Sequence, residues 1–228
     1  MRVIPPSHQV LFLPPGPALL ANLELAGRTC YKSEHRITTD SATSFVRAII
    51  KSGHHSVIEH ASVTVRFVCD RGVSHELVRH RLAAYSQEST RYANYGQERF
   101  GREITVIRPL FWPRGSVAYA RWEQAMLAAE TAYLELLDLG AKAQEARAVL
   151  PNSLKTEVVM TANLREWRHV FNLRCAAAAH PQIREIMLPL LAELSQDLPV
   201  VFEDLARRFA PEIRSLAQLR QELDQPPA

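Results

Sequence analysis

Residues 61 to 70 alternate between apolar and polar side chains, and this pattern constrains the fold more than any other part of the chain. The odd positions are all apolar, namely Ala61, Val63, Val65, Phe67 and Cys69. The even positions are polar or charged, with Val68 as the exception. Because the side chains of a strand point alternately to its two faces, a period of two predicts a strand with one buried face. Such strands are typical of antiparallel or mixed sheets, so we expect a sheet of that kind.

Apolar periodicity and turn residues predict further elements along the chain. Additional strands are expected from Gln9 to Leu13, Thr105 to Ile107 and Leu154 to Thr161. Helices are expected from Ala18 to Arg28, from a cap at Asp40 or Ser41 to Gly53, from Val73 to His80, from Val117 to Leu139, and from Ala141 to just before Pro151. Another helix is expected to begin after Asn163, which with Glu166 three residues later resembles a capping box. Further helices are expected between Gln182 and Glu222, with interruptions at Pro189, Pro199 and Pro211. The polar segment 86–102 is expected to be an exposed loop.

Length and composition favour one globular domain. The chain has 228 residues, of which 47% are apolar and 22% charged, without repeats or low-complexity tracts, so we expect a single domain over residues 1–228. No apolar run is long enough to cross a bilayer and no secretory leader is recognisable, so a cytoplasmic protein without membrane contact is expected. Cys30, Cys69 and Cys175 are odd in number and widely spaced, which argues against a disulfide framework or a zinc ribbon.

Positive charge is carried almost entirely by arginine. Of the 27 basic residues 23 are Arg, yet the net charge is only +3. Arginine recognises planar anions through a fork of N–H donors, whereas proteins that bind nucleic acid usually have a stronger overall positive charge. The balance therefore favours small phosphorylated ligands over nucleic acid.

The segment from Arg79 to Tyr92 holds the densest set of groups that could bind such a ligand. It reads Arg-His-Arg-Leu-Ala-Ala-Tyr-Ser-Gln-Glu-Ser-Thr-Arg-Tyr. Guanidinium groups bind phosphate in a bidentate manner and also stack on planar rings, so we interpret the segment as a nucleotide site. The simpler alternative is that the basic triplet only offsets the negative pole of a helix end.

The helix predicted after the Asn163 cap has two informative faces. The first consists of Trp167, Val170, Phe171 and Arg174. A charge thus shares a stripe with apolar residues, and we expect an anionic or polar group to meet Arg174. The second face consists of Arg165, His169 and Asn172, and it suits a ring or a phosphate. The alternatives are that Arg174 reaches water or pairs with an internal carboxylate, and that the second face is only solvated.

Two other kinds of site have weaker support. The segment 53–60 contains the possible metal ligands His54, His55, Glu59 and His60, but their spacing does not match a zinc site and no metal is expected. Ser86 and Ser89 lie near His80 and Glu88 in sequence, but no nucleophile elbow is present, so a serine hydrolase is not favoured. With only 8 glycines and no glycine-rich phosphate motif, a dinucleotide would have to be held by side chains.

The triplet Arg79-His80-Arg81, followed after seven residues by Ser89, resembles the signature of the flavin-dependent thymidylate synthases. The surrounding Gln-Glu-Ser-Thr-Arg-Tyr is similar to the family pattern as well. Further similar positions occur in family order, and they are Gly53-His54, Glu59-His60, Arg147, Leu150-Pro151, Asn163, Arg165 and Phe171-Asn172-Leu173-Arg174. The resemblance covers roughly residues 40 to 190, which is the size of a full domain.

The resemblance implies an α+β fold with long helices packed against a mixed or antiparallel sheet, and a homotetramer with active sites at subunit interfaces. It implies FAD as the cofactor, bound without a Rossmann motif. It also implies a reaction in which dUMP is methylated to dTMP. In that reaction 5,10-methylenetetrahydrofolate donates the carbon and becomes tetrahydrofolate, while NADPH supplies the hydride through FAD.

The resemblance to the family also implies which residues of this chain bind FAD and dUMP. The residues expected around FAD are His54, Ser56, Arg79, His80, Arg81, Gln87, Asn163, Leu164, Arg165 and His169. The residues expected around dUMP are Glu76, Leu77, Val78, Arg79, Gln87, Glu88, Ser89, Thr90, Arg91, Arg147 and Arg174. The family often has Gln at position 76 and Glu at position 87, so the charges of Glu76 and Gln87 depart from its pattern.

Arg174 and Ser89 are the candidates for a direct part in the reaction. A cation at the carbonyl and N3 edge of uracil stabilises the negative charge that develops as C5 becomes electron-rich, and Arg174 suits this role. Ser89 is expected to be a phosphate or pyrimidine ligand rather than an attacking group. The segment 79–92 is then expected to set FAD and dUMP face to face.

Three rival functions remain open at this stage. A nucleic-acid-binding module would use the arginines at positions 79, 81, 91, 99 and 102 on phosphates, with affinity that falls steeply with salt. A metal hydrolase centred on the segment 53–60 would lose activity to chelators. A different flavoprotein would bind FAD and ignore dUMP.

Overall fold

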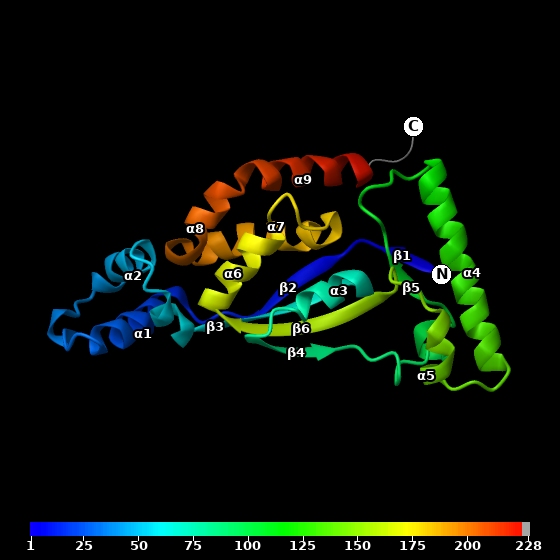
Figure 1. The fold of residues 1–228 in the computed structure, drawn as a ribbon, viewed down its shortest axis with the longest axis horizontal. Helices are drawn as coiled ribbons and strands as arrows, with labels where there is room; N and C mark the ends of the chain where they lie inside the picture. The colour runs from blue at the N-terminus through cyan, green and yellow to red at the C-terminus, as the bar shows by residue number, and fades with distance from the viewer. Residues whose placement is uncertain (225–228) are drawn as a thin grey trace.

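A computed structural model describes residues 1–224 and has a four-stranded antiparallel sheet at its centre (Figure 1). The strand order is β2-β3-β6-β4, with β2 at Ser7–Phe12, β3 at Ser62–Asp70, β6 at Lys155–Asn163 and β4 at Ala83–Gln87. The strands predicted near residues 9–13, 61–70 and 154–161 are confirmed, as are the antiparallel sheet and the α+β fold class.

β3 and β6 pair along all nine residues of each strand. The apolar side chains of β3 point to one face, where Val63, Val65 and Phe67 are completely buried. The opposite face is polar, and Thr64 and Thr161 share a hydrogen bond of 2.9 Å across it. The period of two in the sequence therefore corresponds to a buried face and a polar face, as predicted.

Helices cover the buried face of the sheet (Figure 1). They are α3 (Arg71–Leu77), α6 (Leu164–Arg174), α7 (Pro181–Asp197) and α8 (Pro199–Arg208), while α9 (Ala210–Asp224) packs outside them on α7 and α8. Trp167 anchors α6 to the sheet, because its completely buried indole donates a hydrogen bond of 3.1 Å to the Val63 carbonyl. Arg168 ties the same helix to α8 through a bidentate contact with Asp204, at 2.8 and 2.6 Å.

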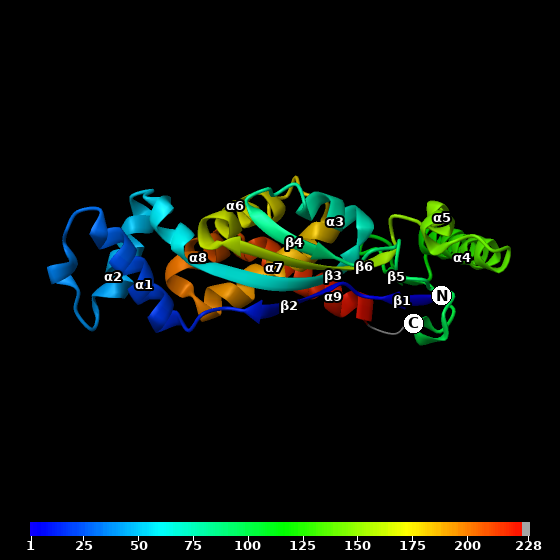
Figure 2. The ribbon, with the colours of Figure 1, turned by 90° about the horizontal axis from the view of Figure 1, so that it is seen from below.

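Smaller units extend from the two ends of the sheet (Figure 1 and Figure 2). At one end lie α1 (Gly16–Thr29), α2 (Ser41–Lys51) and the 3-10 helices Glu34–Arg36 and His55–His60. At the other end lie α4 (Val117–Asp138), α5 (Ala143–Ala146), the 3-10 helices Glu98–Phe100 and Arg147–Val149, and a parallel pair of β1 (Arg2–Ile4) with β5 (Thr105–Ile107). A second buried cluster, which includes Trp122 and Tyr133, packs within this end.

Two sequence predictions around the segment 79–92 are wrong in detail. The helix expected from Val73 to His80 ends at Leu77, so the basic triplet lies beyond it. The hydroxyl of Tyr85 lies beside this end, 2.7 and 2.8 Å from the carbonyl oxygens of Leu77 and His80, which share its single proton. The segment expected to be a loop from residue 86 begins as the edge strand β4, which pairs with β6.

Pro189 does not interrupt the C-terminal helices as expected, because α7 runs through it. A proline inside a helix leaves the carbonyl four residues earlier without its backbone donor. That carbonyl belongs to Glu185, and it accepts a hydrogen bond of 2.7 Å from the Arg220 side chain on α9. A tertiary contact thus replaces the missing backbone bond, whereas Pro199 and Pro211 stand at helix starts.

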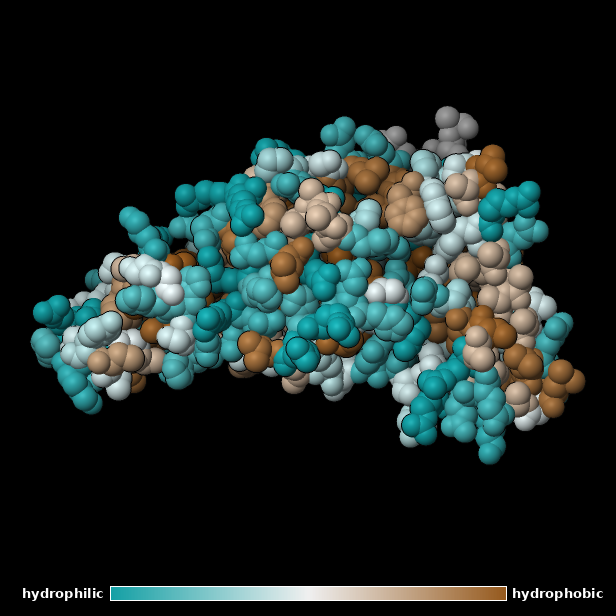
Figure 3. Space-filling model, in the orientation of Figure 1, coloured by the Kyte–Doolittle hydropathy of each residue, from teal (hydrophilic) through white to brown (hydrophobic). Residues whose placement is uncertain are grey.

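None of the helices in residues 1–224 is both long enough and apolar enough to cross a bilayer. The face of the molecule drawn in Figure 3 has hydrophilic and hydrophobic residues interspersed over it.

The close packing around Gly27 predicts the effect of a small substitution. A Cβ on Gly27 of α1 would lie 2.7 Å from the Phe45 ring and 3.2 Å from Val57. Alanine gains about 1 kcal/mol of helix propensity over glycine, but overpacking a core typically costs about 1–3 kcal/mol. Gly27→Ala is therefore expected to lower the free energy of unfolding, as measured by denaturant titration. Gly16→Ala, where the added Cβ has ordinary contacts of 3.7 Å or more, is the control; equal stability of the two variants would contradict the packing argument.

Candidate active site

Arg174, the last residue of α6, meets Glu76 and His80 beside the sheet. Its Nη1 donates to Glu76 Oε2 at 2.5 Å, and its Nη2 donates to the Glu76 carbonyl at 3.1 Å. Its Nε donates to His80 Nε2 at 3.0 Å. The polar partner expected for Arg174 is present, and it includes an internal carboxylate, one of the alternatives considered. These three contacts leave one N–H on each Nη free, because a guanidinium carries five.

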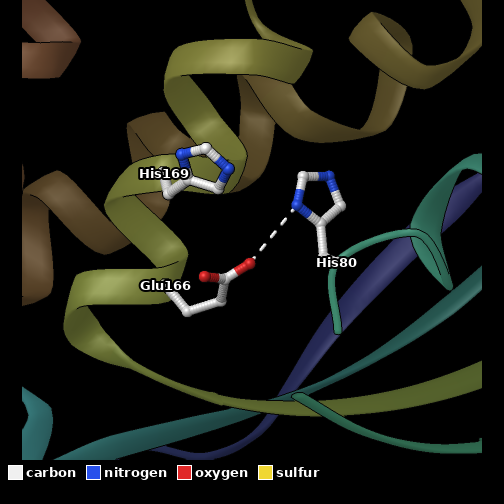
Figure 4. Close-up of side chains that lie close together, drawn as sticks. All are labelled: His80, Glu166 and His169. Atoms are coloured by element: carbon white, nitrogen blue, oxygen red, sulfur yellow. Dashed lines mark ion pairs between the residues drawn. The ribbon is translucent and has the colours of Figure 1, made fainter. Parts of the chain in front are cut away.

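His80 is buried and neutral. The residue is only 4% exposed. Burial, together with the charges of Arg174 and His169, lowers the pKa of the His80 ring to about 4. The Arg174 Nε can only donate, so His80 Nε2 must carry the lone pair. The single proton of the neutral ring is therefore on Nδ1, which lies 3.4 Å from Glu166 Oε1 (Figure 4).

The start of α6 brings these groups together. The Asn163 side chain caps the helix by accepting a hydrogen bond of 2.9 Å from the Glu166 backbone N–H, so the predicted cap is confirmed. Glu166 and His169 then lie about one turn apart and both face His80. The rings of His80 and His169 are 5.8 Å apart and roughly perpendicular.

A cavity of about 410 Å³ opens beside this group and is called the α6 cavity below. It is lined by Glu59, Leu82, Asn163, Arg165, Glu166 and His169. Arg165 donates to Glu59 at 2.5 Å, which joins α6 to the 3-10 helix His55–His60. Three of the residues predicted to bind FAD, at positions 163, 165 and 169, thus share one cavity.

The other residues predicted around FAD are placed differently. His54 and Ser56 are exposed and do not line the α6 cavity. Arg79 and Arg81 are exposed on either side of the buried imidazole. The side chain of Leu164 is completely buried, so only its backbone is available to a ligand.

A second cavity, of about 470 Å³, lies where β4 ends and β6 begins, and is called the β6-start cavity below. It is lined by Arg71, Thr90, Gln144, Arg147, Ala148, Leu150, Pro151 and Asn152. Arg147 Nη1 donates to Thr90 Oγ1 at 3.3 Å. Two guanidinium groups therefore border one cavity, an arrangement suited to a phosphate.

Arg71 is a candidate ligand that the sequence patterns did not single out. It is the first residue of α3 and directly follows β3. Its Nη1 is buried, and no group within residues 1–224 accepts a hydrogen bond from it. A buried donor without an acceptor is rare in proteins, and an anion in the adjoining cavity would satisfy it. A charged residue directly after a predicted half-buried strand was the signal that could have identified it.

Three of the residues predicted around dUMP lie at or beside the end of α3 and differ in burial. The side chain of Leu77 is completely buried, and Val78 follows it at the helix end, 37% exposed. Gln87 Nε2 donates to the hydroxyls of Ser74 and Thr156, at 2.9 and 3.2 Å. The amide of Gln87 is therefore a donor to two buried hydroxyls, a role that a glutamate could not take.

The turn after β4 is held by contacts within it and with Tyr95 and β6. Glu88 accepts hydrogen bonds from the Tyr95 hydroxyl at 3.1 Å and from Lys155 at 3.0 Å. Ser89 Oγ accepts from the Arg91 backbone N–H at 3.3 Å, and the Arg91 side chain is exposed. No imidazole or carboxylate of the described chain bonds to the Ser89 hydroxyl. Without a base at this distance, the geometry favours a ligand over a nucleophile at Ser89.

β4 separates the two halves of the segment 79–92. The basic triplet precedes this strand and Ser89 follows it. The two cavities lie at opposite ends of β6, whose nine residues extend over about 26–30 Å. Within one chain, the segment therefore holds its two halves apart. The expectation that it sets FAD and dUMP face to face stays a prediction.

One group of potential metal ligands converges in the described part of the chain. It consists of His80, Glu166 and His169, whose ligand atoms lie within 4.8 Å of one another (Figure 4). Coordination by His80 needs a free ring lone pair, but Nε2 is occupied by Arg174 and Nδ1 carries the proton. As arranged, the group suits hydrogen bonding rather than coordination.

Comparisons with known proteins agree on one family. Residues 17–200 match the sequence profile described as thymidylate synthase complementing protein. A flavin-dependent thymidylate synthase of Geobacter sulfurreducens is 37% identical over 191 residues, which is 81% of this chain and 81% of that protein. Proteins of the same name from Mycobacterium tuberculosis and Pyrococcus furiosus are 36% and 33% identical, over 83% and 75% of this chain and 79% and 69% of their own lengths.

The low pKa of His80 predicts how stability depends on pH. Below about pH 6.5 the unfolded chain protonates this ring, whereas the folded chain keeps it neutral down to about pH 4. Stability is therefore lost as the pH falls through this window, by about 3 kcal/mol from this residue. His80→Gln is expected to remove that part of the loss in denaturant titrations at pH 7 and pH 4. Identical pH dependence in both proteins would contradict the assignment.

Proposed function

Because the chain belongs to the thymidylate synthase complementing protein family, we propose that it is a flavin-dependent thymidylate synthase that converts dUMP to dTMP. In this proposal 5,10-methylenetetrahydrofolate supplies the carbon, NADPH supplies the reducing equivalents, and tetrahydrofolate is the second product. The observation that carries it within the structure is the guanidinium of Arg174, which is held by three contacts and keeps one free N–H on each Nη.

The α6 cavity has the donor set that a flavin requires. Flavins present ring carbonyls and nitrogens together with phosphates, which amide, guanidinium and imidazole donors can bind. Asn163, Arg165 and His169 supply these three types of donor, and Leu82 supplies an apolar contact for a ring. We propose that these residues hold FAD, with His54, Ser56, Arg79 and Arg81 contributing from neighbouring surfaces. FAD, when bound, supplies the redox chemistry that lets NADPH reduce the transferred carbon.

Arg174 is proposed to activate uracil by electrostatics. The two free N–H groups can donate to the carbonyl and N3 edge of the pyrimidine, where negative charge develops as C5 becomes electron-rich. The Arg174 side chain is only 19% exposed, so its attraction for that charge is screened less than in water. Its existing bonds to Glu76 and His80 fix its orientation before substrate binds, so little reorganisation is needed.

The β6-start cavity is proposed to bind the phosphate of dUMP. Arg147 and Thr90, both expected there by family resemblance, are in contact, and Arg71 adds a buried guanidinium nitrogen without an acceptor. Ser89 and Arg91 lie on the adjoining turn. Bidentate arginine contacts are the strong kind of phosphate contact, so this end is expected to contribute most of the nucleotide affinity.

The separation of the cavities supports a site assembled from several copies. The α6 cavity proposed for FAD and the β6-start cavity proposed for the dUMP phosphate lie at the two ends of β6, about 26–30 Å of strand apart, so one chain would hold the two ligands apart. We propose that the flavin-facing end of one copy meets the phosphate-facing end of another, within a homotetramer. Each chain would form a single catalytic domain that supplies different halves to different sites.

The proposed function predicts a specific cofactor dependence. The purified chain is expected to release tritium from C5 of dUMP and to form dTMP only when FAD, NADPH and methylenetetrahydrofolate are all present. Turnover would be followed with each component omitted in turn. Dependence on a subset of the components, or a chain that binds FAD but ignores dUMP, would contradict the proposal.

Arg174→Ala is the variant that tests the electrostatic role in the same assay. It is expected to retain FAD and to lose most dTMP formation, by about a hundredfold or more, the usual cost of removing one donor to a developing charge. Arg207→Ala is the matched control, since Arg207 is an exposed arginine of α8 that pairs with Glu203.

A further inference from the structure

We propose that Glu166 is a positioning residue for Arg174 and acts through the ring of His80. The inference rests on the proposed function, because it concerns how the group that faces uracil is oriented. It assigns a role to a residue that lines the α6 cavity but has no such role in the family resemblance.

Glu166 lies beside the ring nitrogen of His80 that carries the proton. The residue is 6% exposed, and its carboxylate Oε1 lies 3.4 Å from His80 Nδ1 (Figure 4). Nδ1 makes no hydrogen bond to any other group in residues 1–224. The Glu166 carboxylate, in turn, has no hydrogen bond from another described residue, so each is the available partner of the other.

The tautomer of His80 links Glu166 to Arg174. The Arg174 Nε–H needs a lone pair on His80 Nε2, and this requires the proton to be on Nδ1. An acceptor beside Nδ1 favours that tautomer, as second partners of histidine rings generally do. If the proton moved to Nε2, two N–H donors would face each other and the contact with Arg174 would be lost.

The groups that surround His80 come from three elements. They are Glu166, His169 and Arg174 on α6, Glu76 on α3, and Tyr85 on β4. Arg174 and His169 disfavour a charged ring, and burial acts in the same direction. The Tyr85 hydroxyl bonds to the His80 backbone carbonyl and fixes the position of the residue without contacting the ring. Glu166 is thus the acidic group that faces the ring nitrogen opposite Arg174.

The contacts of His80 connect the α6 cavity with Arg174. Glu166 lines the α6 cavity proposed for FAD, whereas Arg174 is the residue proposed to bind uracil. A chain of contacts runs from Glu166 through His80 and Arg174 to Glu76. Loss of the acceptor at one end is expected to release the guanidinium at the other, because Arg174 would then be held by Glu76 alone.

Two substitutions separate the acceptor from the size of the side chain. Glu166→Met keeps the length and removes the acceptor, whereas Glu166→Gln keeps a carbonyl oxygen that can accept the Nδ1 proton. The control is Asp204→Asn, which weakens a different anchor of the same helix, the contact with Arg168. Each variant would be measured as the full chain, by 15N NMR of labelled histidine and by the rate of dTMP formation.

The wild type and Glu166→Gln are expected to show His80 protonated at Nδ1 and unprotonated at Nε2. Glu166→Met is expected to shift the proton toward Nε2 and to lower kcat roughly tenfold or more, as small displacements of a catalytic group do. FAD affinity should stay within a few-fold of the wild type in all variants. Asp204→Asn should lose stability but keep the tautomer and kcat.

Several outcomes would overturn the inference. An unchanged His80 tautomer in Glu166→Met, or a shifted tautomer with unchanged kcat, removes the positioning role. A large loss of FAD affinity in both Glu166 variants with normal kcat at saturation would make Glu166 a flavin ligand instead. Absence of dTMP formation by the wild type would overturn the proposed function, whereas the NMR readout would still decide whether Glu166 sets the tautomer.

Discussion

The antiparallel pairing of β3 with β6 is the constraint on which the rest of the structure depends. Its nine residue pairs give the sheet a buried face for the helices and fix what lies at each end of β6. At one end Asn163 turns the chain into α6, which carries Glu166, His169 and Arg174. At the other end the strand starts close to Asn152 and the β6-start cavity. The pairing fixes the register and the extended length of β6, so the α6 cavity and the β6-start cavity are held at a fixed separation.

A partly buried polar chain orients the group proposed to act on uracil. Arg174 is hydrogen-bonded to Glu76 and His80, and Glu166 lies 3.4 Å from the other ring nitrogen of His80. Glu76 is the most exposed member of the chain, whereas His80 and Glu166 are buried, where an unpaired group would be costly. The guanidinium of Arg174 is permanently charged and can only donate hydrogen bonds. Its contact with His80 therefore requires a lone pair on His80 Nε2, and the ring proton must be on Nδ1. Glu76, where the family often has Gln, adds a full negative charge next to Arg174 and so places a carboxylate close to the proposed substrate.

Local patterns in the sequence predicted most of the fold but less of the site. The alternation of residues 61–70, the Asn163 cap and the stripe that ends at Arg174 are set by neighbours in sequence, and each is confirmed. β4 and the passage of α7 through Pro189 depend on partners far along the chain, so periodicity could not show them. Arg71 was missed for the same reason, since its significance lies in a cavity completed by Thr90 and Arg147.

The central claim is that the two ends of β6 serve different active sites. Co-expression of an Arg165→Ala chain, altered at the α6 cavity, with an Arg147→Ala chain, altered at the β6-start cavity, tests it most directly. Each variant alone is expected to be nearly inactive. If a site draws its two halves from different copies, random mixing restores about a quarter of the sites, and dTMP formation should recover accordingly. A mixture no more active than the two variants measured separately would show that both ends of one chain serve the same site, and would contradict the account.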